Sequence, residues 1–262
     1  MEPEFESLYE TFVVTKKLEN NAHIVFLGDL HIGADGSHFN EAIANILSQV
    51  PENTYFAFLG DLVDMATKNS VANVYEQSLT PQAQISIVSD LLEHFKDRTL
   101  GVVQGNHDYR IVKEVGFDPI MEVCRIMKIP YSRSYMILHL EVEGQDFVFA
   151  MHHGIAGGRG KAASTRQGEY FERFLSYGVD VYVTGHTHKP AVVPFSHAAY
   201  DKATKQVKYE QGFFVTIPSM LQDELYALKR LYEPPSSMFP IVSLNVDSKK
   251  EKLIDIRWIK IL

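Results

Sequence analysis

Residues 24–31 read IVFLGDLH, and residues 55–64 read YFAFLGDLVD. In each stretch a short apolar run leads into a glycine and then into acidic or imidazole side chains. Short runs rich in β-branched and aromatic residues that end at glycine favour buried strands over helices. A strand buried on both faces reads as a nearly continuous apolar run, which is typical of a parallel sheet. The two stretches therefore predict an α/β fold.

Three later segments repeat this plan. The apolar runs 100–103, 147–151 and 179–184 lead into Gly105-Asn106-His107-Asp108, His152-His153-Gly154 and Gly185-His186-Thr187-His188. Functional groups in open α/β sheets collect just beyond the carboxyl ends of the strands, so we expect all five polar blocks to meet at one edge. Together they offer oxygen and imidazole ligands without a thiolate, a mixture that suits first-row divalent metals. The blocks predict a metal site.

Composition narrows the class of protein. The chain has 262 residues and 45% hydrophobic content, enough for one large domain with a well-filled core. Its net charge of -8 argues against a broad basic face that grips a long duplex, although a local basic pocket is compatible with it. The single cysteine, Cys124, excludes an internal disulfide and fits a reducing compartment, where we expect it to be a small core residue.

No segment of the sequence predicts secretion or membrane insertion. Residues 1–10 carry four glutamates and no basic residue, which is the wrong sign for a signal peptide. No apolar stretch approaches the length of a membrane span. We therefore expect a cytoplasmic protein with no membrane partner.

The remaining pattern predicts the layering of the fold. Apolar spacing and proline positions predict helices over 39–50, 81–95, 119–127 and 162–175, and further strands over 12–18, 191–195, 207–217, 241–246 and 253–261. Strand–helix alternation followed by a run of strands indicates two mixed β-sheets packed face to face with helices outside. We expect one domain over 1–262, in which 1–21 form an N-terminal extension with the first strand and 189–262 complete the second sheet.

The polar blocks, in this order, resemble the calcineurin-like metallophosphoesterase superfamily. The matching motifs are Asp-x-His, Gly-Asp-x-x-Asp, Gly-Asn-His-Asp, a His after a strand and Gly-His-x-His, and they run from Gly28 to His188. The resemblance implies a four-layer αββα sandwich with a two-metal centre. It implies that the metal ligands are Asp29, His31, Asp61 and His188 for the first ion, and Asp61, Asn106, His152 and His186 for the second. We expect manganese, with iron, zinc, cobalt or nickel as alternatives.

Two positions keep alternative interpretations. His152 aligns with the family ligand, but strand alternation points His152 and His153 to opposite faces, so His153 is the alternative ligand. Asp108 is either a helix N-cap beside the site or a participant in it.

The resemblance also assigns two catalytic residues. His107 matches the histidine that stabilises or protonates the leaving oxygen, and Asp64 matches the carboxylate that orients its imidazole. Two cations about 3.5–4 Å apart can clamp a phosphoryl oxygen and lower the pKa of a bridging water. We expect the resulting hydroxide to attack phosphorus in line while the metals neutralise the developing charge.

The substrate is the least specified part of the prediction. The protein serine/threonine phosphatase branch has Arg-Gly after the second carboxylate block, whereas Met65-Ala66 stands here. The pattern is more similar to bacterial and phage phosphodiesterases and nuclease-like members. Arg159, Lys161 and Arg166 follow the fourth block and could hold phosphates beyond the scissile one, or belong to a solvated connection.

We expect a phosphodiesterase that acts on a nucleotide or a nucleic-acid end. The alternatives are a phosphomonoesterase for a small phosphorylated metabolite and a non-catalytic scaffold with the same fold.

Overall fold

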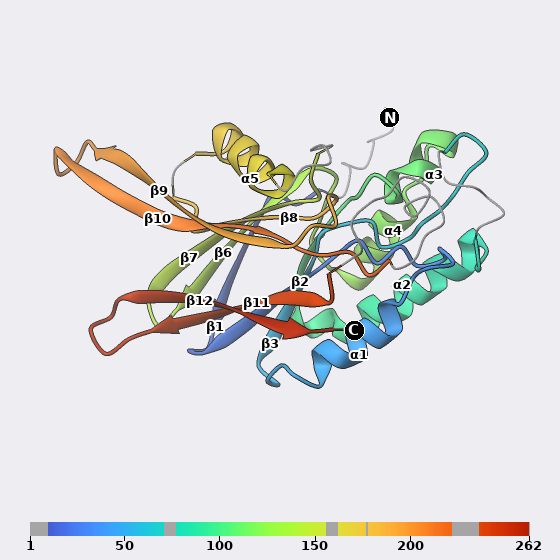
Figure 1. Cartoon of the computed structure of the whole chain (residues 1–262), viewed down its shortest axis with the longest axis horizontal. Coiled ribbons are helices and arrows are strands. Elements are labelled where there is room, and N and C mark those ends of the chain that lie inside the picture. Colours follow the sequence, from blue (N-terminus) through green and yellow to red (C-terminus); the bar gives the residue numbers. More distant parts are fainter. Residues whose placement is uncertain (1–9, 71–76, 156–161, 177, 222–235, 262) are drawn as a thin grey trace, which may run out of the picture.

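The computed structural model describes residues 10–70, 77–155, 162–176, 178–221 and 236–261 (Figure 1). Its α-helices are α1 (Phe39–Leu47), α2 (Pro81–Phe95), α3 (Asp108–Val115), α4 (Pro119–Met127) and α5 (Ala163–Phe174), with a short 3-10 helix at Lys96–Arg98. Its strands are β1 (Val13–Leu18), β2 (Ala22–Leu27), β3 (Thr54–Phe58), β4 (Thr99–Val103), β5 (Tyr131–Ser132), β6 (Tyr135–Val142), β7 (Gln145–His152), β8 (Val181–Thr184), β9 (Ala191–Asp201), β10 (Gln206–Thr216), β11 (Met238–Val246) and β12 (Lys252–Lys260).

The strands form two six-stranded mixed sheets. The first has the order β1-β6-β7-β8-β10-β9, and the second has the order β12-β11-β2-β3-β4-β5. In the second sheet β2, β3, β4 and β5 run parallel to one another, while β11 is antiparallel to β2. The prediction of two mixed sheets is confirmed.

The sheets pack face to face and helices cover their outer faces. Phe26 of β2 meets Phe149 of β7 across the space between the sheets, with ring centroids 5.6 Å apart. On the outer side of the first sheet, Phe171 of α5 packs on Tyr182 of β8. Figure 1 shows α5 over this sheet and α1 and α2 against the other sheet. The arrangement is the four-layer sandwich predicted from the sequence.

Two helices begin where their prolines predict. Thr80 accepts a hydrogen bond from the backbone N–H of Ala83 at the start of α2, and Asp118 accepts one from Met121 at the start of α4. In both helices proline occupies the first turn, where its missing N–H has no intrahelical partner to lose. These local signals explain why the predicted bounds of both helices agree with the structure.

The C-terminal region differs from its prediction, because it contributes to both sheets. The β10 strand runs parallel to β8 and carries the β9–β10 hairpin onto the first sheet, whereas β11 pairs with β2 and brings β12 to the second. The β6 strand and the α3 helix were also not predicted. Buried and half-buried residues alternate along β6, which is the pattern of a strand covered more fully on one face.

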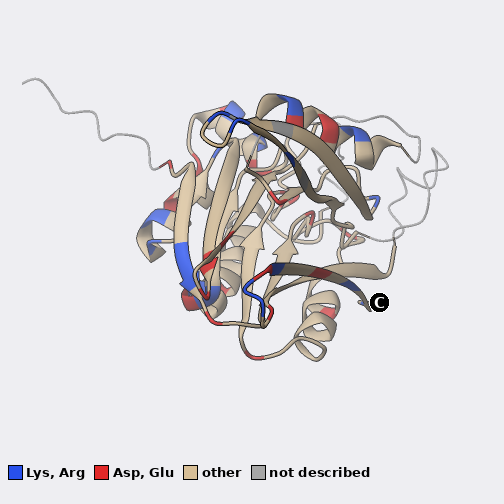
Figure 2. Cartoon of the chain, turned by 90° about the vertical axis from the view of Figure 1, so that its left-hand side faces the viewer, with Lys and Arg blue, Asp and Glu red and all other residues tan. Residues whose placement is uncertain are grey.

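Charged residues lie mainly at the periphery of the fold. In Figure 2 the central strands are tan, while Lys, Arg, Asp and Glu are distributed over helices, outer strands and turns. No helix in the described ranges is long and apolar enough to cross a membrane.

Candidate metal centre

The polar blocks meet at one edge of the sandwich because they follow the carboxyl ends of neighbouring strands. The strands concerned are β2, β3, β4, β7 and β8, which end at Leu27, Phe58, Val103, His152 and Thr184. Backbone hydrogen bonds continue the sheets past these ends. The N–H of Asp29 donates to the carbonyl of Gly60 at 2.9 Å, and the N–H of Gly185 donates to the carbonyl of His153 at 2.7 Å. The predicted meeting of the blocks is confirmed.

The first group of ligand atoms comes from Asp29, His31 and His188, whose donor atoms lie within 4.8 Å of one another. Nε2 of His188 is 3.2 Å from Oδ1 of Asp29, and Nε2 of His31 is 3.4 Å from Nε2 of His188. Asp29 and His31 are buried, and His188 is half-buried. A carboxylate oxygen and two imidazole nitrogens therefore converge on one point.

The second group comes from Asp61, His153 and His186. Nε2 of His153 lies 3.3 Å from Oδ2 of Asp61 and 3.2 Å from Nδ1 of His186. It also lies 3.0 Å from Oδ1 of Asn106, which adds an amide oxygen to the group. The other ring nitrogen of His153 donates to the carbonyl of Leu59, so the ring is held with Nε2 toward the group.

Asp61 lies between the two groups. Its Oδ2 is 3.3 Å from Nε2 of His153 in the second group and 3.8 Å from Nε2 of His31 in the first. Its other oxygen, Oδ1, accepts the backbone N–H of His107 at 2.7 Å and is thereby fixed. This is the position that a carboxylate shared by two ions requires.

The histidine of the fourth block must be corrected. His152 points away from the groups: its ring packs on Phe171 of α5, and its Nδ1 accepts the N–H of Gly154. The reason is the parity of β7, since Phe149 and Met151 face the other sheet and His153 continues that side. His153, the alternative, takes the place predicted for His152.

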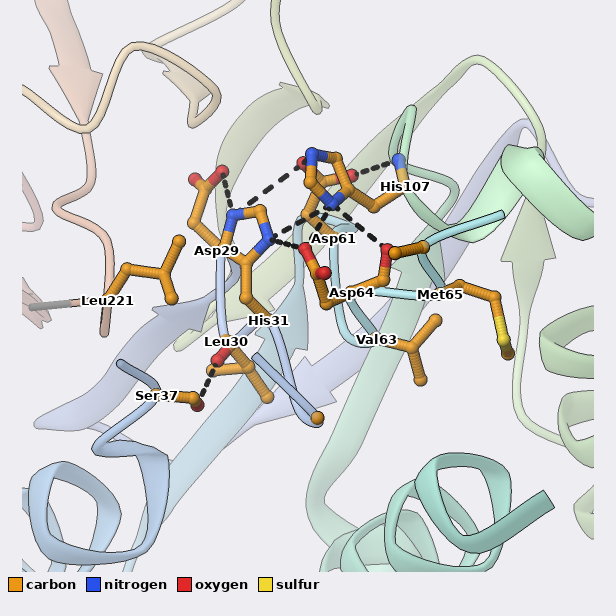
Figure 3. Close-up of polar contacts among 12 residues, drawn as sticks. Asp29, Leu30, His31, Ser37, Asp61, Val63, Asp64, Met65, His107 and Leu221 are labelled. Atoms are coloured by element: carbon orange, nitrogen blue, oxygen red, sulfur yellow. Dashed lines mark hydrogen bonds and ion pairs between the residues drawn. The ribbon is translucent and has the colours of Figure 1, made fainter. Parts of the chain in front are cut away.

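His107 and Asp64 form a pair beside the first group (Figure 3). Nδ1 of His107 donates to Oδ1 of Asp64 at 2.8 Å. Oδ2 of Asp64 accepts a hydrogen bond from Gln77 at 2.6 Å. Although Asp64, His31 and His107 also lie close enough to suit an ion, both carboxylate oxygens of Asp64 already accept hydrogen bonds. Asp64 is therefore placed to orient His107.

Arg110, which the sequence reasoning missed, completes this pair. Its Nη2 lies 2.9 Å from Nε2 of His107, and its Nη1 donates to the carbonyl of Asp64 at 2.6 Å. The signal was present, because Arg110 is three residues after His107 at the start of a helix, where such residues are neighbours. Because the sequence does not predict α3, the spacing of three residues does not indicate by itself that the two side chains are neighbours.

Burial and neighbouring charges together shift the pKa values of the ionisable side chains at the site. Burial opposes ionisation of Asp61, but the neighbouring rings of His153 and His107 outweigh it and hold the pKa of Asp61 well below its usual range. Burial lowers the pKa of His31 to about 4, and the charge of His107 adds to this. Burial also disfavours the charged form of His107, yet Asp61 and the hydrogen bond to Asp64 raise its pKa.

The backbone at this edge adopts a conformation that L-residues rarely take. Positive φ angles occur at six non-glycine residues of the blocks or next to them: Asp29, His31, Asp61, Met65, His186 and His188. Such angles each cost about 1–3 kcal/mol and persist only where surrounding structure imposes them, typically at functional sites. The loops also touch backbone to backbone, since a Cβ built on Gly105 would overlap the backbone nitrogen of Asp61.

Asp108 has a structural place. Its Oδ1 accepts the N–H groups of Leu62 and Val63, and its Oδ2 accepts that of Gly105. Burial, with the charge of Asp61, raises its pKa to about 6. Asp108 is the first residue of α3, and the N-cap position belongs to His107, so the N-cap interpretation is wrong. Its carboxylate instead ties the loop after β3 to the loop after β4.

The residues present fit divalent metal ions. Oδ1 of Asp29 is fully buried and accepts no hydrogen bond from the residues that the structure describes, although buried carboxylate oxygens are normally satisfied. This oxygen faces imidazole nitrogens. These nitrogens also face one another, and not every one of these close contacts has a hydrogen atom that could form a hydrogen bond. A cation at each group would satisfy these lone pairs at once, and oxygen with imidazole is a donor set for first-row metals.

The structure describes one of the three cations that are predicted to bind phosphate. Arg166 lies exposed on α5, three residues after its first residue. Arg159 and Lys161 lie outside the described residues. Their role in substrate binding stays a prediction.

Comparison with known proteins gives a family match over most of the chain. The sequence model of calcineurin-like phosphoesterases matches residues 22–190. No curated protein matches the chain. Among solved structures, Vps29 from Chaetomium thermophilum is similar at 12% identity, over 91% of this chain and 97% of that one, with a TM-score of 0.40.

Two further structures are similar. Vps29 of the same organism in complex with a cyclic peptide matches at 12% identity, over 92% and 97% of the two chains, with a TM-score of 0.36. A protein of unknown function, AQ665 from Aquifex aeolicus, matches at 19% identity, over 64% and 80%, with a TM-score of 0.31. Nothing about function follows from likenesses this weak.

Proposed function

The chain belongs to the calcineurin-like phosphoesterase family, and from that premise we propose that it is a phosphodiesterase dependent on two divalent metal ions, preferably manganese. Asp29, His31, His188 and Asp61 would hold one ion, and Asp61, Asn106, His153 and His186 the other. The observation that carries the proposal is the position of Asp61 between the two groups. Cations bound there supply Lewis-acid activation of a phosphoryl group and of water.

His107 serves the leaving oxygen. Because its Nδ1 donates to Asp64, its Nε2 is the ring nitrogen left for a leaving oxygen, which would take the place of the contact with Arg110 there. The raised pKa keeps a proton on the ring at higher pH than an ordinary histidine, which suits a general acid. Asp64 does not titrate in this range, since its hydrogen bonds from His107 and His31 outweigh burial and depress its pKa.

Arg110 serves the phosphoryl group. Its guanidinium touches Nε2 of His107, so an oxygen that reaches His107 also reaches Arg110. An arginine fork binds phosphate oxygens with directed hydrogen bonds, which stabilise charge that develops during transfer. The side chain is only partly exposed, and its contact with the backbone of Asp64 restrains it before substrate binds.

A diester fits the site better than a monoester. A diester carries one negative charge and two organic groups, whereas a monoester carries nearly two charges and one organic group. Arg110 is the described arginine in contact with His107, and a cavity lies beside the centre whose described lining residues include no Lys, Arg, Asp or Glu. We place the substrate among nucleotides or nucleic-acid ends, in the phosphodiesterase or nuclease-like branch of the family.

A paired assay tests the proposal. Purified protein with added Mn²⁺ should hydrolyse bis-p-nitrophenyl phosphate faster than p-nitrophenyl phosphate, and should contain two metal ions per chain by elemental analysis. The reverse preference would establish a phosphomonoesterase instead. Metal-loaded protein inactive on both esters would favour a scaffold.

A further inference from the structure

A cavity of about 360 Å³ opens between α5 and the ends of β6 and β7. We call it the aromatic pocket, and its main walls are Tyr135, His152, Ile155, Tyr170, Phe171 and Phe174. Its volume is within the range of about 300–1,000 Å³ that small-molecule sites occupy. No Lys, Arg, Asp or Glu is among the described residues that line it. The pocket therefore suits an uncharged, mainly apolar group.

The rings in the pocket are arranged as packing surfaces and reach solvent. Tyr135 is edge-on to Phe174, with ring centroids 5.4 Å apart, and His152 is tilted against Phe171 at 5.7 Å. Phe174 and Tyr170 have large side chains with apolar surface, yet Phe174 is 69% exposed and Tyr170 is 44% exposed. An exposed apolar patch of this kind marks a binding site more often than a scattered hydrophobic residue does.

The aromatic pocket lies beside the metal centre, at the end of β7. His152 in its wall and His153 in the second ligand group are consecutive residues with opposite directions. Gly154 lines the pocket and lies against the centre as well, since a Cβ built on it would be 2.8 Å from Cβ of His186. The segment 152–154 therefore borders both the pocket and the second ligand group, so the two sites are neighbours.

We propose that the aromatic pocket binds a nucleobase of the phosphoester substrate while the scissile phosphate lies at the metal centre. The inference rests on the proposed phosphoesterase function and deepens it by naming the organic group. A base has a flat π-face that stacks on aromatic side chains whatever its sequence identity. The absence of charged groups from the described lining disfavours a second phosphate there and favours a neutral ring.

Binding of a free nucleoside tests the pocket apart from catalysis. Saturation-transfer NMR on the metal-loaded protein should show transfer to the base protons of adenosine, which has no phosphate for the metals. Phe174→Ala should abolish the transfer, because the exposed ring is removed without opening the core. Tyr209→Ala is the matched control, since Tyr209 is 80% exposed on the β9–β10 hairpin. Equal transfer in the wild type and in Phe174→Ala would overturn the inference.

Competitive inhibition connects the pocket to the centre. Adenosine 5′-monophosphate should inhibit hydrolysis of bis-p-nitrophenyl phosphate more strongly than ribose 5-phosphate, by about 5- to 150-fold if one base stacks. Phe174→Ala and Tyr170→Ala should reduce that ratio and leave inhibition by ribose 5-phosphate unchanged. Phe174→Leu distinguishes stacking from apolar contact, because only stacking is lost when the ring is replaced by an aliphatic side chain.

The outcomes separate the two proposals. Hydrolysis of bis-p-nitrophenyl phosphate that adenosine 5′-monophosphate and ribose 5-phosphate inhibit equally would support the phosphodiesterase function and overturn the nucleobase pocket. Nucleoside binding that depends on Phe174, in a metal-loaded protein without phosphoesterase activity, would keep the pocket and overturn the proposed function. A ratio restored in Phe174→Leu would overturn stacking on Phe174 and show that the base is held there by apolar contact.

Discussion

Nε2 of His153 lies 3.2 Å from Nδ1 of His186, although the two residues come from loops that follow different strands. Two imidazole nitrogens at this separation compete for one proton or share one cation. The carbonyl of Leu59 fixes the His153 ring, so its other nitrogen cannot turn away. The pair therefore defines one side of a metal site in the folded chain.

Substitutions of the two neighbouring histidines of the fourth block should have different effects on metal content and activity. His153→Ala should bind fewer than two metals per chain and lose more activity than the roughly 10–100-fold that outer-shell partners contribute. His152→Ala should keep both metals, because its ring faces α5. Elemental analysis and kcat on bis-p-nitrophenyl phosphate check both variants. Metal loss in His152→Ala alone would reverse the assignment.

Substitution of the shared carboxylate should affect both ions. Asp61→Asn removes a negative charge that lies within 3.8 Å of both ligand groups, so metal content should fall below two and turnover should be abolished. Asp146→Asn, on the exposed end of β7, is the control and should change neither quantity. Two tightly bound metals with near-normal kcat in Asp61→Asn would show that this carboxylate is not shared.

His107 should separate catalysis from metal binding. His107→Ala is expected to retain metal and lose about 10²–10⁴-fold in kcat, the usual contribution of a positioned proton donor. The loss should shrink for esters with good leaving groups, since these need little protonation. Equal losses for alkyl and nitrophenyl esters would contradict the role at the leaving oxygen, and loss of metal would make His107 a ligand.

Arg110 should act through directed hydrogen bonds. Arg110→Ala is expected to reduce kcat/KM by about 10- to 150-fold, the effect of losing a hydrogen bond to a charged group. Arg110→Lys should recover only part of this, because lysine keeps the charge without the planar fork. Arg125→Ala, on the exposed side of α4, is the control. Full recovery in Arg110→Lys would reduce the role of Arg110 to charge alone.

Metal affinity should increase with pH. Burial disfavours the charged form of His153, but the nearby carboxylates of Asp61 and Asp29 outweigh it and raise its pKa above the ordinary value. In the metal-free protein the ring therefore carries a proton at neutral pH, which an ion must displace. Calorimetric titration of chelator-treated protein with Mn²⁺ in buffers of different ionisation enthalpy should detect proton release. Affinity that does not change between pH 6 and 8 would contradict this.

The sequence predicted the layers and most of the site because both depend on local patterns. Apolar runs ending in glycine identified the strands that meet at the metal centre, and the prolines at 81 and 119 identified two helix starts. The choice between His152 and His153 needed the parity of β7, which depends on where the opposite sheet lies. The direction of each histidine side chain thus depends on the tertiary structure, and it cannot be predicted from two neighbouring histidines in the sequence.

Other parts were beyond the sequence for similar reasons. Arg110 reaches His107 only once α3 exists, and α3 is a short helix in which the buried residue is the polar Asp108 rather than an apolar one. The division of the C-terminal strands between the sheets depends on pairings of β10 with β8 and of β11 with β2, which join distant parts of the chain. The aromatic pocket combines side chains from β6, β7 and α5, so no single segment predicts it.

The carboxylate of Asp108 has a consequence for how the centre acquires its metals. By binding N–H groups of Leu62, Val63 and Gly105, it joins two ligand-bearing loops before any ion arrives. The conformational entropy of Asp61 and Asn106 is thus already lost when the chain folds. Binding of a cation therefore does not incur this cost again. Loading should accordingly be a simple bimolecular step, with a rate proportional to metal concentration and no slow rearrangement after binding.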